Sequence, residues 1–553
     1  EKNNMLKDDN VRLVVVALTA ALATAAAFIV LMDRKESELD RRSIKRGPMS
    51  PKGRALTTPG KSPKKKNISL ETKPAEKLAS VLNVDPDVMM GKMLEDTSID
   101  KIRLYELSSL RDYFESANLP NCINAAGYVQ KEYNKVMGKE DFIISDIVRK
   151  HKGHGSSDAF VRAGPRSTVH FDPSKVTAAI VTCGGLCPGL NNVIRELVHA
   201  LEYLYGVKSI IGIKGGYNGF SGKPGYDPIR LTADSVLDCH HQGGTILASS
   251  RGGFEIETIL KFLVDHNINQ LYVIGGDGTH RGANILSETC IERKLNIAVV
   301  GIPKTIDNDV DLIDRSFGFT TSVEAAQAAI LSAKTEARCN LPNGIGIVKL
   351  MGRSAGFIAV HATMASGDVD LCLVPEVEIE LEGPDGCLSF LWERVKQQGH
   401  AVVVVAEGAG EELLGRSAET DQGGNRKLPA IGEFLKNKIA AYFKQQGSEA
   451  TVKYIDPSYM IRSVPANASD ALYCMLLAQN AVHGAMAGYT AFSTGLVNNR
   501  VVYIPIPRMV ATSPRVMDPR GRTWERVLSM TRQPQHNPAF ELETCTVNDR
   551  TMV

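Results

Sequence analysis

The strongest constraint on the fold is a pattern that repeats along the chain from Lys175 onward. Short apolar runs rich in β-branched residues each end in a glycine-rich or acidic loop, and a helical pattern follows. The runs are "VTAAIVT", "SIIGI", "LYVIGG", "IAVVGI", "GIGIVKL" and "AVVVVAEG". Continuous apolar strands that alternate with helices predict a parallel sheet covered on both faces. Ligands of such folds bind beyond the C-terminal ends of the strands, where all of these loops lie.

Length and composition indicate a multidomain globular enzyme. The chain has 553 residues, which is too long for one hydrophobic core, so we expect two or more domains. It is 43% hydrophobic and 23% charged, and its net charge of +2 argues against a nucleic-acid-binding protein. The ten cysteines are irregularly spaced, so no disulfide framework is predicted. We interpret the close pair Cys183 and Cys187 as ordinary reduced thiols.

The N-terminal part of the chain differs from the rest. Residues 13–32 contain no charged side chain and are long enough to span a bilayer as a helix. A membrane anchor, a cleaved targeting signal and a buried soluble helix all stay open. Residues 34–66 carry 12 Lys or Arg against 3 acids, which predicts a disordered linker or a segment that favours an anionic leaflet. The positive-inside rule then predicts a cytoplasmic location, tethered if anchored, and import into a plastid or another organelle is the alternative.

Two glycine-rich loops follow predicted strands. In "TCGGLCPGLN" the glycines let the backbone leave a strand sharply, and the next helix can direct its N–H groups at an anion. In "GGDGTHRGA", residues 275–283, glycines permit close approach of a phosphate, and Asp277 can hold a Mg²⁺ ion shared with phosphate oxygens. Thr279 can cap the following helix or bind a phosphate. The alternative for each loop is a plain tight turn.

An acidic loop follows the next strand. "IPKTIDNDVD", residues 302–311, holds four carboxylate or amide side chains, namely Asp307, Asn308, Asp309 and Asp311. A carboxylate beside a phosphate site can take the proton from an attacking hydroxyl, and Lys304 can supply a point charge. The alternative is an Asx-rich turn that caps the next helix.

Taken together, the motifs resemble a known family. "TCGGLCPGLN", "GGDGTHRGA", "PKTIDND", "KLMGRSAGFIA", "VAEGAGEE" and "YIDPSYMIRSVPANASD" occur in this order. The chain is similar to the 6-phosphofructokinases, and most closely to their ATP-dependent branch from plants and trypanosomatids. The likeness covers residues 175–507 and extends more weakly upstream to about residue 75.

The resemblance implies an α/β fold of two Rossmann-like three-layer domains with parallel-rich sheets and the active site in the cleft. It also implies a homotetramer. The predicted parts are an apolar anchor or targeting segment, a basic linker, an N-terminal extension packed on the core, a nucleotide-binding domain in two pieces, a sugar-phosphate-binding domain and a C-terminal tail. Their respective bounds are 1–33, 34–74, 75–174, 175–320 with 463–510, 321–462 and 511–553.

The resemblance also implies a reaction, in which the γ-phosphoryl group of ATP moves to the 1-hydroxyl of fructose 6-phosphate with Mg²⁺ as cofactor. Asp307 is then the base, Thr305 lies beside the transferring group, Asp309 supports the base and the metal site, and Arg353 neutralises developing charge with Lys304. The residues implied to bind ATP are Gly185, Arg251, Gly276, Asp277, Gly278 and Thr279, with Asp277 on the metal. Those implied to bind the sugar phosphate are Thr305, Asp307, Met351, Gly352, Arg353, Glu407, Lys453, Tyr459 and Arg462.

Three departures from relatives qualify the resemblance. Lys304 stands where bacterial ATP-dependent members have glycine and pyrophosphate-dependent members have lysine. Gly278, however, stands where pyrophosphate-dependent members have a second aspartate, which would obstruct the α-phosphate of a nucleotide, so ATP is the expected donor. Lysine and tyrosine replace an arginine and a histidine at Lys453 and Tyr459. Gly344 replaces an arginine that reaches across a subunit interface in bacterial members.

Three rival functions share features with this sequence. NAD and diacylglycerol kinases also use a GGDGT loop, but NAD kinases pair it with an Asn-Glu dipeptide that this chain lacks. A catalytically silent, membrane-tethered regulatory subunit would be expected to lose the base or the metal ligand, and both are present. A pyrophosphate-dependent phosphofructokinase is the third rival, favoured by Lys304 and disfavoured by Gly278.

Overall fold

The computed structural model describes residues 101–124, 136–138, 140–148, 156–415, 419–420 and 427–535. All of them belong to one compact unit, Leu94–Val553. The predicted apolar segment 13–32 and the basic linker lie outside the described residues, so their interpretations stay predictions. Within the described ranges, no helix has the length and apolar character needed to cross a membrane.

The larger sheet has ten strands in the order β1-β5-β18-β17-β11-β10-β7-β8-β9, with β4 paired to β5. The strands β8, β7, β10, β11 and β17 run parallel to one another, whereas β18, β9 and β4 pair antiparallel with their neighbours. The bounds are β1 Lys101–Tyr105, β4 Phe142–Ile144, β5 Ser156–Arg162, β7 Thr177–Thr182, β8 Ser209–Ile213, β9 Ile229–Arg230, β10 Gln270–Gly275, β11 Ala298–Pro303, β17 Phe492–Val497 and β18 Arg500–Pro505.

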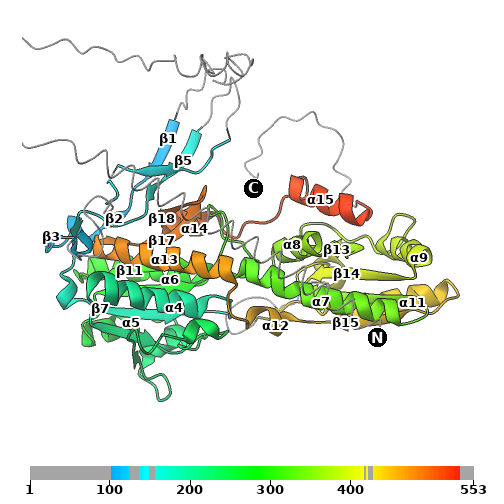
Figure 1. Cartoon of the computed structure of the whole chain (residues 1–553), viewed down its shortest axis with the longest axis horizontal. Helices are drawn as coiled ribbons and strands as arrows, with labels where there is room; N and C mark the ends of the chain where they lie inside the picture. Colours follow the sequence, from blue (N-terminus) through cyan, green and yellow to red (C-terminus); the bar gives the residue numbers. More distant parts are fainter. Residues whose placement is uncertain are drawn as a thin grey trace, which may run out of the picture. The chain divides into compact units, whose positions relative to one another are not determined.

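The smaller sheet has four parallel strands in the order β13-β14-β12-β15. Their bounds are β12 Gly344–Leu350, β13 Leu371–Leu373, β14 His400–Ala406 and β15 Thr451–Ile455. The predicted parallel strands are therefore confirmed, but they are divided between two sheets. We call the larger sheet with its helices the first lobe and the smaller sheet with its helices the second lobe (Figure 1).

Helices cover both faces of each sheet. Those of the first lobe are α4 Leu190–His199, α5 Ile256–Asp265, α6 Asp277–Glu292, α13 Ala468–Met486 and α14 Ile506–Thr512. Those of the second lobe are α7 Phe319–Cys339, α8 Phe357–Ser366, α9 Cys387–Gln398, α10 Glu411–Leu414, α11 Ile431–Gln445, α12 Ser458–Arg462 and α15 Arg522–Thr531. A π-helical turn, η4 Ala200–Leu204, extends α4.

Short elements complete the described part of the chain. They are β2 Ser108–Ser109, β3 Leu119–Pro120, β6 Thr168–Val169, β16 Tyr489–Thr490, η1 Leu110–Asp112, η2 Cys122–Asn124, η3 Pro173–Lys175, η5 Gly216–Ser221 and η6 Cys239–His241.

The period of two along β7 explains the layered core of the first lobe. Ile180 packs into the cluster that contains α4 and α13 residues, whereas its neighbour Val181 packs into the cluster with α5 and α6. Along β14, Val404 and Val405 alternate in the same way between the cluster with α8 and the cluster with α9 and α11. Each sheet is thus buried on both faces, as continuous apolar runs predict.

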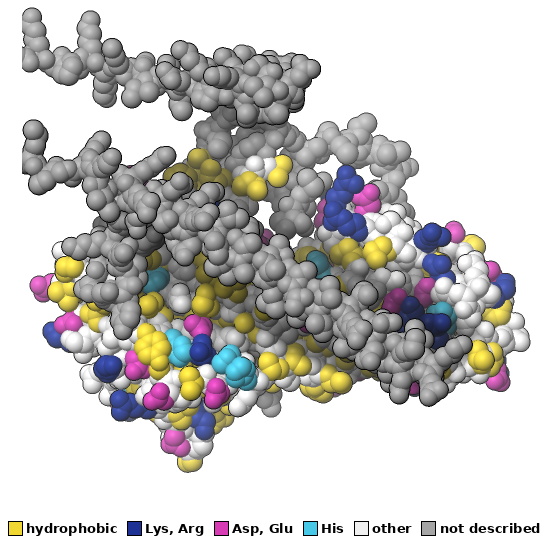
Figure 2. Space-filling view, in the orientation of Figure 1, with side chains coloured by type: hydrophobic (Ala, Val, Ile, Leu, Met, Phe, Trp, Pro, Cys, Tyr) yellow, Lys and Arg dark blue, Asp and Glu magenta, His cyan; other side chains and the backbone are white. Residues whose placement is uncertain are grey.

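The ends of the described chain add to both lobes. Within the predicted N-terminal extension, β5 pairs with β18 and so joins the first sheet. Within the predicted C-terminal tail, α15 packs Trp524 and Val527 into the core of the second lobe. On the face shown in Figure 2, Lys and Arg side chains are interspersed with Asp and Glu side chains. The exact domain bounds remain predictions.

Candidate active site

The acidic loop and the GGDG loop lie side by side because their strands are neighbours. The parallel strands β10 and β11 are in register to their ends, with Gly275 opposite Pro303. The backbone N–H of Lys304 then donates to the carbonyl oxygen of Gly275 at 2.9 Å. The first turn of α6, which begins at Asp277, therefore starts next to the acidic loop.

The polar residues of the acidic loop make different hydrogen bonds. Asn308 adopts a left-handed conformation with φ of 58°, which asparagine tolerates better than most residues. Its buried side-chain oxygen accepts a hydrogen bond from the Ser316 N–H at 2.9 Å. The Thr305 hydroxyl donates to Asp309 Oδ1 at 2.5 Å and accepts from the Asp307 N–H at 3.3 Å. Asn308 and Asp309 thus hold the turn together around Asp307.

Asp307 is the carboxylate with the most perturbed environment in this loop. Its Oδ1 is enclosed and has no hydrogen-bond partner among the described residues. Burial, together with repulsion from Asp309 and Glu407, raises the pKa of Asp307 to about 8, although Lys304 and Arg353 act in the opposite direction. A carboxylate with such a pKa is a much stronger base than an ordinary aspartate.

Two loops of the second lobe supply two of the four charges that act on Asp307, those of Glu407 and Arg353. Arg353 follows β12, and Glu407 follows the adjacent parallel strand β14. These loops are bound to each other, because the Gly408 N–H donates to the Gly352 carbonyl at 3.1 Å. Gly352 has φ of 135°, and a Cβ there would lie 2.5 Å from the Ala355 carbonyl oxygen, so only glycine fits. The site therefore combines strand ends from both sheets.

Asp277 and Asp309 form the acidic side of the site. Burial, and secondarily the charge of Asp309, raises the pKa of Asp277 to about 6. Among the residues that the structure describes, no group of three or more His, Cys, Asp or Glu side chains forms a metal site. Mg²⁺ is usually held by one or two carboxylates together with substrate phosphates. The electrostatic strain between these two carboxylates fits such a cation.

The first glycine loop lies against two basic side chains. A Cβ on Gly184 would lie 3.5 Å from the Lys304 Nζ, and one on Gly185 would lie 3.9 Å from an Arg251 guanidinium nitrogen. Lys304 is 7% exposed, and this burial lowers its pKa. The loop therefore lies next to two cations, which suits a phosphate.

Gly278 is exposed at the start of α6, and a Cβ built on it meets no atom of the described protein within 4 Å. Its φ is not in the left-handed region, so the backbone does not require glycine. Neither packing nor conformation explains the absence of a side chain here, which leaves room for a ligand as the reason.

The residues predicted to bind the sugar phosphate differ in burial and in how well they could contact an anion. Arg462 lies on α12 with its guanidinium 4.8 Å from the ring centroid of Tyr459, and its enclosed Nε has no hydrogen-bond partner among the described residues. Lys453 is exposed in the middle of β15, opposite Gly346. Met351 is buried in the core of the second lobe. Arg462 is therefore the best placed of these residues to bind an anion.

A comparison with protein families shows to which family the chain belongs. The Phosphofructokinase family model matches residues 177–499. The chain belongs to the phosphofructokinase family.

Relatives cover most of this phosphofructokinase chain. It is 50% identical over 437 residues to ATP-dependent 6-phosphofructokinase 7 of Arabidopsis thaliana, covering 78% of this chain and 88% of the relative. It is 49% identical over 373 residues to the chloroplastic ATP-dependent 6-phosphofructokinase 5 of the same plant, covering 68% and 69%. It is 47% identical over 391 residues to the ATP-dependent 6-phosphofructokinase of Borreliella burgdorferi, covering 69% and 87%.

Solved structures support the fold. The pyrophosphate-dependent phosphofructokinase of Marinobacter aquaeolei aligns with a TM-score of 0.53 and 19% identity, covering 66% of this chain and 94% of that one. At this identity, the likeness concerns the fold alone. The predicted fold class and the resemblance to phosphofructokinases are confirmed.

Some residues that support the loops of this phosphofructokinase site were not predicted from the sequence. His280 Nδ1 lies 3.0 Å from the Gly276 carbonyl oxygen, and its Nε2 lies 3.2 Å from the Ser493 hydroxyl. Burial lowers the pKa of His280 to about 4, so the ring is neutral, donates from Nδ1 to the carbonyl and accepts from the serine. Arg515, described below, also binds the acidic loop. His280 lies inside the GGDGTHRGA motif, but the motif gives it no role, and Arg515 lies outside every motif, because both residues act mainly through backbone carbonyls.

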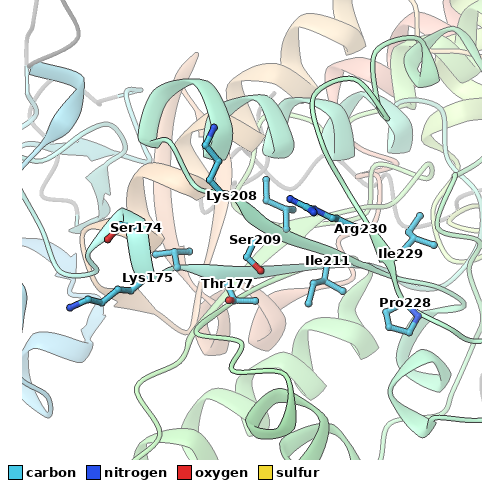
Figure 3. Close-up of a pocket in the computed structure, with 11 residues that line it drawn as sticks. Ser174, Lys175, Thr177, Lys208, Ser209, Ile211, Pro228, Ile229 and Arg230 are labelled. Atoms are coloured by element: carbon cyan, nitrogen blue, oxygen red, sulfur yellow. The ribbon is translucent and has the colours of Figure 1, made fainter.

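A pocket of about 620 Å³ lies elsewhere, beside the N-terminal ends of β7 and β8 (Figure 3). Its lining includes Lys175, Lys208 and Arg230. The glycine-rich and acidic loops follow the opposite, C-terminal ends of the parallel strands β7, β10 and β11, so the pocket is separate from the candidate active site.

Proposed function

We propose that the chain transfers the γ-phosphoryl group of ATP to the 1-hydroxyl of fructose 6-phosphate, which gives fructose 1,6-bisphosphate and ADP. This is the ATP-dependent 6-phosphofructokinase reaction, the committed step of glycolysis. The single observation that carries the residue assignment is the convergence on Asp307 of charges from both lobes: Asp309 and Lys304 from the first, and Glu407 and Arg353 from the second. The names of relatives at about half identity support the same reaction.

Asp307 is the proposed general base. As the sugar O1 attacks the γ-phosphorus, its proton passes to the Asp307 carboxylate, the O1–phosphorus bond forms and the bond to the β,γ-bridging oxygen breaks. The raised pKa makes Asp307 a suitable acceptor for that proton. ADP leaves with the negative charge of the broken bond.

Lys304 and Arg353 neutralise the charge that gathers around the moving phosphoryl group. Lys304 is buried beside the first glycine loop and acts as a point charge. Arg353 approaches from the second lobe, and its planar guanidinium suits phosphoryl oxygens. Thr305 directly follows Lys304, and its hydroxyl donates to Asp309; its proposed role is to lie beside the transferring group.

Mg²⁺ is the proposed cofactor, and Asp277 would hold it, with Asp309 supporting the site. When bound, the ion neutralises phosphate charge and orients the phosphates. The two carboxylates that raise each other's energy in this structure are the groups whose repulsion a divalent cation relieves.

The remaining predicted residues form two binding regions. For ATP, we propose Gly185, Arg251, Gly276, Gly278 and Thr279, around the two glycine loops. For fructose 6-phosphate, we propose Met351 through its backbone, Gly352, Glu407, Tyr459, Arg462 and, with the weakest structural support, Lys453.

A pyrophosphate-dependent reaction is the second candidate function, and Lys304 is the observation that favours it. Gly278 opposes it, because the open space at this position leaves room for the α-phosphate of a nucleotide. We therefore propose ATP as the donor. We also propose a cytoplasmic homotetramer, with a plastid location as the alternative that the chloroplastic relative supports.

The acceptor assignment predicts a selective effect of Arg462→Met. Loss of a charge-assisted hydrogen bond to the 6-phosphate costs about 1.5–3 kcal/mol, so the KM for fructose 6-phosphate should rise roughly 10- to 100-fold, while kcat changes little. Initial rates at varied fructose 6-phosphate, with the product's phosphorylation at O1 checked by ³¹P NMR, measure this.

Arg520→Met is the control for that experiment, because Arg520 is exposed and forms an ion pair with Asp518. It should leave the KM unchanged. An unchanged KM in Arg462→Met, or a phosphate added at a position other than O1, would contradict the acceptor assignment.

A further inference from the structure

A short segment near the end of the described chain, residues 513–517, connects the two lobes, and we call it the strap. It follows α14, which packs in the first lobe, and it precedes α15, which packs against α8 and β13 of the second lobe (Figure 1). No motif of the family resemblance includes it.

On one side, the strap binds the acidic loop. The Asp311 N–H donates to the Ser513 hydroxyl at 3.0 Å. The Arg515 N–H donates to the Asp309 carbonyl at 2.8 Å. The Arg515 guanidinium donates from Nε to the Asn308 carbonyl at 3.0 Å and from Nη1 to the Ile313 carbonyl at 3.2 Å. Residues on both sides of Asp309 are thus held, and Asn308 directly follows Asp307.

On the other side, the strap is linked through the Glu376 carboxylate to the loop that carries Arg353. The Met517 N–H donates to Glu376 Oε1 at 2.9 Å, and the same carboxylate accepts from the Gly356 N–H at 2.9 Å. Gly356 lies three residues after Arg353. The Arg515 guanidinium also lies 5.1 Å from the ring centroid of Phe357, the first residue of α8.

The chemistry at Arg515 is specific to arginine. Its planar guanidinium donates to two carbonyl oxygens at once and stacks on an aromatic ring, which an ammonium group on a flexible stem cannot reproduce. Burial lowers the pKa of this half-buried guanidinium, and the negative charges of Asp311, Asp309 and Asp314 partly offset that effect. A surface charge that only aids solubility would not make two hydrogen bonds to carbonyl oxygens and a contact with an aromatic ring.

We propose that Arg515 is a positioning residue that fixes the acidic loop of the first lobe relative to the Arg353 loop of the second lobe. The inference rests on the proposed roles of Asp307 and Arg353. Because reacting groups must be held within a fraction of an ångström, loosening this link should reduce the rate of the chemical step more than the binding of either substrate.

The test is Arg515→Lys in the otherwise unchanged protein. A displacement of about 1 Å of catalytic groups costs on the order of 100-fold in rate, so we expect kcat to fall roughly 10- to 100-fold. The KM values for ATP and fructose 6-phosphate should stay within about threefold of wild type. Steady-state kinetics with each substrate varied, and thermal melting of each variant, measure this.

Arg508→Lys is the matched control. Arg508 lies on α14, and its guanidinium donates to Asp158 of β5 at 2.8 Å, in an ion pair that involves no residue of the acidic loop. It should lose a similar amount of stability while retaining wild-type kcat. If Arg515→Lys and Arg508→Lys have the same kcat, Arg515 is merely structural and the proposal fails.

A second variant covers the case in which Arg515→Lys does not fold. Ser513→Ala removes only the hydroxyl that binds the Asp311 N–H and the Met509 carbonyl. Its kcat should fall about threefold or more at unchanged KM, and an unchanged kcat would overturn the proposal. Wild-type protein that is inactive with ATP and fructose 6-phosphate would instead refute the proposed function, so the two failures are distinguishable.

Discussion

Asp307→Asn is expected to lower kcat by roughly 10²- to 10⁴-fold, the usual contribution of a general base. The amide keeps the shape of the side chain but cannot take the proton of the sugar hydroxyl. ATP binding should survive, because the proposed nucleotide contacts come from other loops. Steady-state rates give kcat, and titration of ATP by calorimetry gives its affinity.

Asp311→Asn is the matched control, since it makes the same chemical change four residues away in the same loop, where the backbone N–H binds Ser513 and the carboxylate is only one of three charges that offset the burial of Arg515. We expect a kcat within a few-fold of wild type. A full kcat in Asp307→Asn would show that Asp307 is not the base.

Asp307→Asn should also stabilise the folded protein at high pH. The folded-state pKa of Asp307 is raised to about 8 from an ordinary value of 3.8, so folding favours the protonated carboxyl. This stabilisation is complete below the ordinary value and is lost as the pH rises through about 8. Asparagine is neutral throughout, so the Tm advantage of Asp307→Asn should grow from pH 5 to pH 8.5 and reach about 2 °C or more.

Calorimetric scans of wild type and Asp307→Asn at pH 5 and pH 8.5, without nucleotide or metal, measure whether the Tm difference grows with pH. A variant that is less stable than wild type at pH 8.5 would mean that the ionised Asp307 is favourably paired in the folded protein. The raised pKa would then be wrong.

Gly278→Asp should abolish most ATP-dependent activity while leaving the fold intact. A Cβ at this exposed position meets no described atom within 4 Å, so the Tm should hardly change. The new carboxylate would stand next to Asp277 and face the polyphosphate, and such like-charge contacts cost several kcal/mol. We expect kcat/KM for ATP to fall roughly 100-fold or more.

Gly278→Ala separates charge from bulk, because it adds only a methyl group to the same open space. It should retain most of the activity with ATP. If Gly278→Asp bound and used ATP as well as Gly278→Ala does, the identity of this residue would not determine the donor.

Sequence patterns predicted these parallel strands well, because a strand buried on both faces must be apolar along its buried interior, as residues 178–181 of β7 and 401–406 of β14 are. They did not predict β13 and β15. The first has only three residues, and the second is an edge strand with an exposed lysine, Lys453. Nor can apolar runs tell which strands pair, so the division into two sheets came from the resemblance alone.

The candidate site was predictable to the extent that it consists of loops after strands. Register between β10 and β11 places Asp277 beside the acidic loop, as the order of motifs suggested. The contributions of Arg515 and Glu376 were not predictable, because they bind backbone groups of residues far away in the sequence. Such contacts leave no spacing or composition signal, and only the folded chain brings them together.

The central claim is that a site with Gly278 and Lys304 uses ATP as its phosphoryl donor. The most direct test supplies the purified protein with fructose 6-phosphate, Mg²⁺ and either ATP or pyrophosphate, and follows fructose 1,6-bisphosphate. We predict product with ATP and none with pyrophosphate. Product with pyrophosphate alone would contradict the account, because it would mean that Lys304, rather than the open space at Gly278, determines the donor.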